Sequence, residues 1–173
     1  MKRAVSALLL AFAAFTAANA GAELVIEGMS WQRARVAGAR VVAWEDLARL
    51  SDGPPKLDAR MRARLTLKNR GPVPAEGVLL RYSMTARIKQ AAGEAADGAW
   101  GIPFMVDERR VPKVGANKTL DVFLTTSPAL ELYLAKLARA GWWPDRVKLQ
   151  AMIEPHKGAS AVQTLEMILE VAP

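Results

Sequence analysis

The chain has 173 residues, of which 51% are hydrophobic and 24% are charged, with a formal net charge of +7, no cysteine and one histidine. This composition excludes a disulfide framework, a thiol nucleophile and any metal site with cysteine ligands. A single histidine also excludes a histidine-based catalytic triad and a multi-histidine metal cluster. The length suits one globular domain stabilised by packing.

The first twenty residues have the order of a secretory signal peptide. Lys2 and Arg3 precede the apolar block SALLLAFAAFTAA, and small residues continue to Ala20. The block is about 13 residues long, shorter than the roughly 20 that a helix needs to cross a bilayer. We expect residues 1–20 to be removed near Ala20, an uncleaved anchor being the alternative. Residues 21–173, with a net charge of +5 once Lys2 and Arg3 are gone, are then a single domain in the periplasm or outside the cell, without a transmembrane segment.

Two strand candidates open the predicted domain, at 24–31 and 33–44. Trp31 and Trp44 belong to their apolar pattern, so we expect both rings in the core. A weaker helical turn is predicted at 44–50, and the Gly-Pro-Pro sequence that follows would end it.

The clearest alternation lies on either side of a predicted turn. Apolar residues occupy every second position over 61–67 and again over 78–88, as in half-buried strands. Between them, Asn69 and Gly71 tolerate positive φ, and two prolines fix φ and remove backbone donors, so neither strand can continue. The connection is either a long hairpin or an arch from one sheet to the other.

The second half of the chain predicts more strands around one helix. Strand candidates lie at 101–106, 120–126, 146–154 and 162–171. Ser127 as a cap, a proline at the first helical position and Gly141 after the last turn delimit a short amphipathic helix at about 128–140. Together the elements predict a mainly β fold: an immunoglobulin-like antiparallel β-sandwich with this helix across one end or edge.

Two segments, ARLTLKNRGPVPAEGVLLRYSM and VPKVGANKTLDVFL, carry a family resemblance. They resemble the CARDB-like and related immunoglobulin-like modules of bacterial exported proteins, in which a strand ends in Asn-x-Gly, a second strand follows an Ala, and a later Gly precedes another strand. The matching positions are Asn69, Gly71, Ala75, Gly115 and the strand from Leu120 to Leu124. The resemblance implies an arch between sheets and a role in adhesion or assembly, with no active site. The helix departs from the simple module pattern.

Catalytic constellations are missing from the sequence pattern. His156 lies in the turn-like EPHKGAS without a companion at metal-ligand spacing. The adjacent acids Glu45-Asp46 and Asp107-Glu108 are typical of solvated turns. No calcium loop, phosphate-binding glycine loop or GxSxG elbow occurs, although spacing alone does not exclude a Ser-Lys pair. We expect a protein that is not an enzyme and holds no cofactor or metal.

Basic side chains occupy the outward positions of both alternating runs. The first row holds Arg60, Arg62, Arg64 and Lys68, and the second holds Arg81, Arg87 and Lys89. No acid interrupts either row in the sequence; a hairpin would merge the rows, whereas an arch would give each sheet its own. Such faces favour anionic envelope components. The alternative is an ordinary solvated face that discourages edge aggregation. Nucleic acid is not expected, because aromatic residues are not interleaved with the basic ones.

Tryptophans offer a rival site. Trp142 and Trp143 follow the predicted helix, and Trp100 opens AWGIPF. Exposed, these rings would anchor a partner or stack on a sugar; buried, they would seat the helix on a sheet.

Two functions follow from these features. The preferred one is an exported, non-catalytic binding or assembly module of the bacterial cell envelope, which contacts an envelope protein or anionic component through a sheet face, an edge or the tryptophan loops. The alternative is a periplasmic carrier that holds a small apolar or anionic ligand between sandwich and helix, lined by Trp100, Phe104 and Trp142. The oligomeric state is left open.

Overall fold

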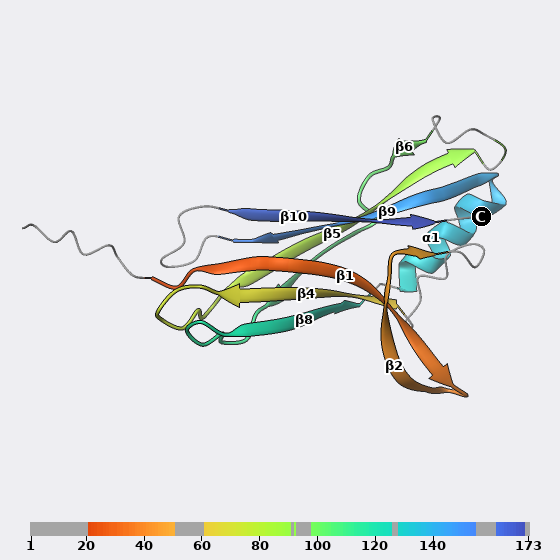
Figure 1. Ribbon diagram of the computed structural model, residues 1–173. Coiled ribbons are helices and arrows are strands. Elements are labelled where there is room, and N and C mark those ends of the chain that lie inside the picture. The colour runs from red at the N-terminus through yellow and green to blue at the C-terminus, as the bar shows by residue number, and fades with distance from the viewer. Residues whose placement is uncertain are drawn as a thin grey trace, which may run out of the picture.

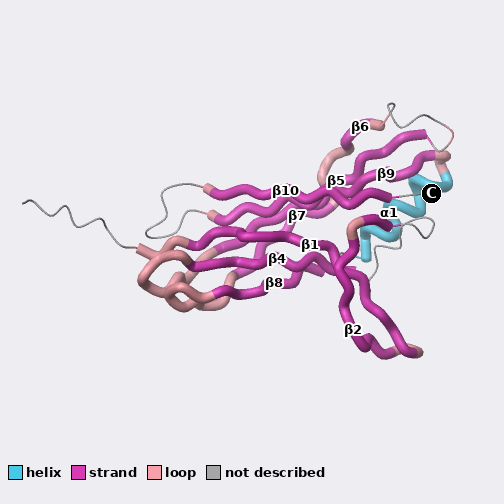
Figure 2. The backbone as a smooth tube through the Cα atoms, viewed as in Figure 1, coloured by secondary structure: helices cyan, strands magenta, loops and turns pink. Residues whose placement is uncertain are grey.

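The computed structural model describes residues 21–50, 61–90, 92, 98–125, 128–154 and 162–171. Two sheets, one of four strands and one of six, pack face to face, and a helix lies at one end (Figures 1 and 2). Almost all strand pairs are antiparallel. The predicted fold class, a mainly β sandwich with one short helix, is confirmed. The predicted signal peptide lies outside the described residues, and none of the helices within them is long and apolar enough to span a membrane.

The strands are divided between the sheets as follows. In order across the four-stranded sheet lie β2 (Arg40–Leu47), β1 (Leu24–Ala37), β4 (Met61–Asn69) and β8 (Thr119–Thr125). Across the six-stranded sheet lie β3 (Arg49–Leu50), β10 (Gln163–Val171), β9 (Trp142–Ile153), β5 (Leu79–Gln90) and β6 (Ala99–Trp100), and β7 (Met105–Arg110) also pairs with β5. The pair β3–β10 is parallel.

The core lies between the two sheets and follows the predicted alternation. In β4 the residues Met61, Ala63, Leu65 and Leu67 are buried, and in β5 so are Leu80, Tyr82, Met84 and Ala86. Trp31 is 1% exposed, as expected for a core residue. Burial of these apolar faces is the main source of stability for a domain without disulfides.

The connection between β4 and β5 is an arch, because the two strands belong to different sheets. The fully buried side chain of Asn69 organises it: Oδ1 accepts hydrogen bonds from the backbone of Glu23 and Gly71, and Nδ2 donates to the carbonyl oxygens of Val73, Val114 and Gly115. β4 ends at Asn69, and this asparagine ties the departing chain to two other segments.

Several predicted boundaries are wrong at the start of the domain. β1 runs without interruption through Gln32 as far as Ala37, and the turn comes at Gly38, whose φ is +62°. The predicted helical turn at 44–50 is instead the end of β2 followed by β3. Pairing with β1, in which Leu47 lies opposite Trp31, overrides the weak local helical preference.

The remaining elements match more closely. The candidate at 101–106 is displaced: β6 ends just before it, and β7 begins at Met105, within its last two residues. β8 and β10 lie within one residue of prediction at each end, and β9 starts four residues earlier than expected, at Trp142. Helix α1 (Pro128–Arg139) ends before Gly141, whose φ is +79°, and packs Tyr133 and Leu137 against the core. The predicted cap Ser127 lies outside the described residues.

Candidate functional site

The outer face of the four-stranded sheet carries an arginine held between two aromatic rings. The guanidinium carbon of Arg62 lies 4.0 Å from the ring centroid of Trp44 and 3.8 Å from that of Phe123. Its Nε donates to Oε1 of Gln32 at 2.8 Å. Burial, with a smaller contribution from the charge of Arg64, lowers the pKa of Arg62. Trp44 is therefore a partner of an outward-facing arginine and not the core residue that its apolar pattern predicted.

An acid from the neighbouring hairpin neutralises this face. Asp46 on β2 accepts hydrogen bonds from Gln32 at 2.8 Å and Ser30 at 3.1 Å, and its Oδ2 lies 3.1 Å from Nη2 of Arg64. The hydrogen bond from Gln32 contributes most to lowering the pKa of Asp46. The row that is uninterrupted in sequence is thus interrupted in space, because adjacent strands supply the acids. Arg60 lies outside the described residues.

The basic row on the six-stranded sheet is also paired. Arg81 contacts Glu108 at 3.5 Å and also contacts Glu154. Nη1 of Arg87 lies 2.9 Å from Oδ2 of Asp145, in a pair whose side chains are 15% and 13% exposed. Nε of Arg87 also donates to the carbonyl oxygen of Gly98 at 3.2 Å. Arg87 therefore fixes the chain that leads into β6.

A shallow hollow of about 250 Å³ lies on the outer face of the six-stranded sheet. The register places its polar residues in neighbouring cross-strand rows: Arg81 opposite Met152, and Ser83 opposite Gln150. The full lining is Arg81, Tyr82, Ser83, Val106, Gln150, Met152 and Thr164. Tyr82 is buried and lines the hollow from below. Its burial raises its pKa to about 12, and a 2.9 Å hydrogen bond from its hydroxyl to Asp107 reinforces the shift.

The aromatic residues expected to line a carrier pocket do not come together. Trp100 is 40% exposed, and its ring lies 5.0 Å from Nζ of Lys148, which belongs to the outer face of the sheet. Phe104 packs against the core, with its ring centroid 6.1 Å from that of Tyr133. Trp142 is 37% exposed at the start of β9.

Trp143 packs against the core. That it seats the helix end on the sheet stays a prediction. The proposal of a ligand between sandwich and helix stays a prediction, without a shared aromatic lining.

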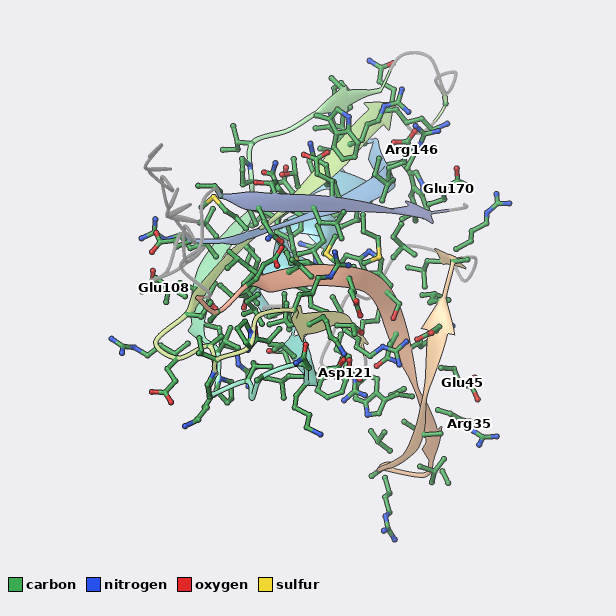
Figure 3. The ribbon with its side chains drawn as sticks, turned by 60° about the vertical axis from the view of Figure 1, so that its left-hand side comes forward. Arg35, Glu45, Glu108, Asp121, Arg146 and Glu170 are labelled. Carbon is green, nitrogen blue, oxygen red and sulfur yellow. The ribbon has the colours of Figure 1, made fainter. Side chains whose placement is uncertain are left out.

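A projecting hairpin is the most distinctive surface that the sequence reasoning missed. β1 pairs with β4 only as far as Arg33 opposite Met61, whereas its pairing with β2 continues to Ala37 opposite Arg40. Beyond Arg33 the two strands form a ribbon that leaves the sandwich (Figure 1), and Figure 3 shows Arg35 and Glu45 on it. We call residues 34–43 the arm.

The arm is both apolar and basic. Val36, Val41 and Val42 are 37%, 41% and 53% exposed. Exposed Arg35 and Arg40 accompany them, and Arg35 is paired with Glu45 at 3.3 Å. The alternation of Arg and Val in RARVAGARVVA is the sequence signal for this ribbon. The sequence pattern predicted a single strand at 33–44, whereas the structure has a turn there between the end of β1 and the start of β2.

β10 presents an edge with little pairing. One side pairs with β9 along Gln163 to Glu170, but on the other side β3 pairs only with Glu170 and Val171. On the same side, the backbone N–H of Ile26 on β1 donates a 3.3 Å hydrogen bond to Oε1 of Gln163. We call residues 163–168 the open edge.

Comparisons with known proteins show no family for this chain. No family model and no curated protein matches the sequence. Among solved structures, the β-D-glucoside glucohydrolase of Trichoderma reesei has a TM-score of 0.39 and 11% identity, over 87% of this chain and 19% of that one. A β-glucosidase of Erythrobacter marinus has a TM-score of 0.35 and 12% identity, over 86% and 15%. A protein from Archaeoglobus fulgidus has a TM-score of 0.34 and 14% identity, over 84% and 97%.

The chain spans less than a fifth of the two glucosidase chains. At these TM-scores the likeness carries no functional argument, so function has to be argued from the surfaces. Among the described residues, no group of three or more His, Asp or Glu side chains is arranged to hold a metal ion.

Proposed function

We propose that this chain is an exported, non-catalytic binding module of the bacterial cell envelope, and that it contacts a protein partner through the arm. The order of the first twenty residues supports export. The resemblance of the arch and the following strands to CARDB-like modules supports a role in adhesion or assembly. The observation that carries the proposal is the arm itself, a two-stranded ribbon whose valines are exposed although no described strand covers them.

A two-stranded ribbon gains little stability from its own pairing in water. Exposed valines on such a ribbon lose solvent-accessible apolar area only when another surface covers them, which favours association. Arg35 and Arg40 flank them, and Glu45 pairs with Arg35. The partner surface is therefore expected to be an apolar patch with an acidic rim, since charge complementarity accelerates association and orients the partner.

The test is site-specific photo-crosslinking in cells. A photo-reactive residue replaces Val42 on the arm or, as a matched control, Val106, which is 73% exposed on β7. We expect a discrete protein adduct from position 42 and none of the same mass from position 106. Arg40→Glu in the Val42 probe is expected to reduce that adduct several-fold, because it reverses the charge that faces the acidic rim.

Two results would contradict the arm proposal. One is the same adduct from both probe positions, which would mean non-specific capture. The other is an adduct from position 42 whose yield is unchanged by Arg40→Glu and also by Val41→Ser. That result would mean that neither the charge nor the apolar surface of the arm recognises the partner.

A further inference from the structure

We propose that the open edge of β10 binds an extended segment of another polypeptide as an additional strand, with apolar residues facing inward and basic residues facing outward. This site is separate from the arm, and its argument does not rest on the arm proposal. It begins with the backbone. Over 163–168, β10 is bonded to β9 on one side, while no described strand pairs with the other side, which lies beside the first half of β1. The pairing with β3 shows that this edge accepts a parallel strand at Glu170 and Val171.

Apart from Gln163, whose side chain accepts a hydrogen bond from Ile26 of β1, the open edge lacks the features that protect strand edges from pairing. Natural edges are blocked by Pro, Lys, bulges or covering side chains. On β8, Arg109 covers the edge by donating to the carbonyl oxygen of Phe123. The first half of β1 carries an irregularity between Ile26 and Gly28. The open edge, by contrast, reads QTLEMI and contains neither proline, glycine nor a basic residue.

Side chains at this edge are incompletely covered on the interior side. Leu165 lies opposite the fully buried Ala151 and so faces the other sheet, yet it is 36% exposed. Met167 on β10 and Ile26 and Met29 on β1 are only partly buried at the margin of the core. Every second side chain of an added strand would face inward beside Leu165 and exclude water from this margin. The inward residues of the added strand are therefore apolar.

The outer side of the open edge carries one acid, Glu166, between Thr164 and the exposed Ile168. Glu166 contacts Gln150 at 2.8 Å and Lys148 at 3.7 Å, and its side chain remains 46% exposed. Glu170, next to β3, is 59% exposed and lies 3.9 Å from Arg146 (Figure 3). Opposite charges on adjacent strands are stabilising and like charges are destabilising. The outward residues of the added strand are therefore basic. A second copy of β10 fits poorly in the antiparallel register centred on Glu166, because that register brings two Glu166 side chains together.

The probe is an eight-residue, end-capped peptide of alternating valine and lysine, and the control peptide has every amide N-methylated so that it cannot donate backbone hydrogen bonds. Binding to the full folded chain is measured by titration, and hydrogen exchange locates the site. We expect slower exchange within 163–168 with the first peptide and no change with the control. Leu165→Lys, which places a charge facing inward, is expected to weaken binding about tenfold or more. Val106→Lys on β7 is expected to leave it unchanged.

Each other outcome overturns the proposal. Equal binding of the N-methylated peptide would show that charge alone attracts the probe. Protection at β8, or no protection at millimolar peptide, would show that the open edge does not accept a strand. A dimer in light scattering that Leu165→Lys dissociates would identify a second copy as the occupant. The peptide assay on the Val41→Ser, Val42→Ser variant keeps this test independent of the arm, because peptide binding should persist there.

Discussion

The side chain of Asn69 holds the backbone of Gly71: Oδ1 of the asparagine accepts the glycine N–H at 3.0 Å inside the arch between the sheets. Oδ1 also accepts the N–H of Glu23 at 3.2 Å, so one buried amide joins the start of β1 to the end of β4. This relationship explains why a strand in this chain ends in Asn-Arg-Gly, and it leads to two predictions about stability.

Asn69→Ala should lower the free energy of unfolding by about 3 kcal/mol, because it leaves several buried backbone donors and acceptors without partners. Equilibrium unfolding in urea measures the change. Val73→Ala, in the same arch but 41% exposed, is the control and should change the stability by no more than about 0.5 kcal/mol. Equal effects of the two substitutions would mean that Asn69 does not organise the arch.

Gly71→Ala should destabilise the fold through a steric clash. An added Cβ would lie 2.3 Å from the carbonyl oxygen of Gly21 and 2.7 Å from the backbone nitrogen of Glu23. Since both contacts are with backbone, the segments must separate, and we expect a loss of about 2 to 4 kcal/mol. At Gly28 an added Cβ meets nothing within 4 Å. Gly28→Ala should therefore retain nearly full stability, and a comparable loss at both sites would refute the clash.

The Arg87–Asp145 pair should contribute far more to the free energy of unfolding than the pair between Arg81 and Glu108. Arg87→Met leaves a carboxylate of 13% exposure without its cation, and we expect a loss of about 3 kcal/mol. Arg81 is 49% exposed, so Arg81→Met should cost less than about 1 kcal/mol. Thermal unfolding of both variants measures the difference. A reversed order would show that water screens the Arg87 pair.

Asp46 should make stability depend on pH in the acid range. Its pKa is lowered below 3.8 in the folded chain, chiefly by the hydrogen bond from Gln32. A carboxyl group with a lowered folded pKa contributes stability above its unfolded pKa and loses that contribution as the pH falls through the folded pKa. Wild type should therefore be more stable than Asp46→Asn at neutral pH, and the difference should shrink below pH 3.8. A difference that persists in strong acid would assign the effect to packing.

The arm should contribute to binding without contributing to stability. Its residues pair with each other beyond the point where β4 ends its pairing with β1. Val41→Ser with Val42→Ser should thus change the free energy of unfolding by no more than about 0.5 kcal/mol, because both side chains are already exposed. Calorimetry checks this. A large loss would mean that the valines belong to the folding unit.

Local pattern predicted the strands whose two faces differ most. Leu65 and Tyr82 lie on alternating runs, and both are buried as expected. Asn69 and Gly71 were correctly interpreted as the end of a strand, but a short window could not choose between hairpin and arch. That choice depends on which strands pair, and β4 pairs with β1 and β8, far away in the sequence.

The site residues were harder to predict, because their surroundings come from distant strands. Arg62 and Arg64 are outward-facing as expected, yet Asp46 and the rings of Trp44 and Phe123 arrive from β2 and β8. The exposure of Val42 depends on where β4 stops pairing with β1. Local alternation contains neither fact, so it could not separate a free basic face from a paired one, nor a core strand from an arm.

β1 passes from the sandwich into the arm as one unbroken strand. A tension applied along the arm by a tethered partner would pull β1 lengthwise past β4, so that the cross-strand hydrogen bonds from Leu24 to Arg33 are loaded together in shear and not opened one after another. The domain is therefore suited to bear mechanical load at this attachment, and its resistance to force should exceed what its equilibrium stability alone would suggest.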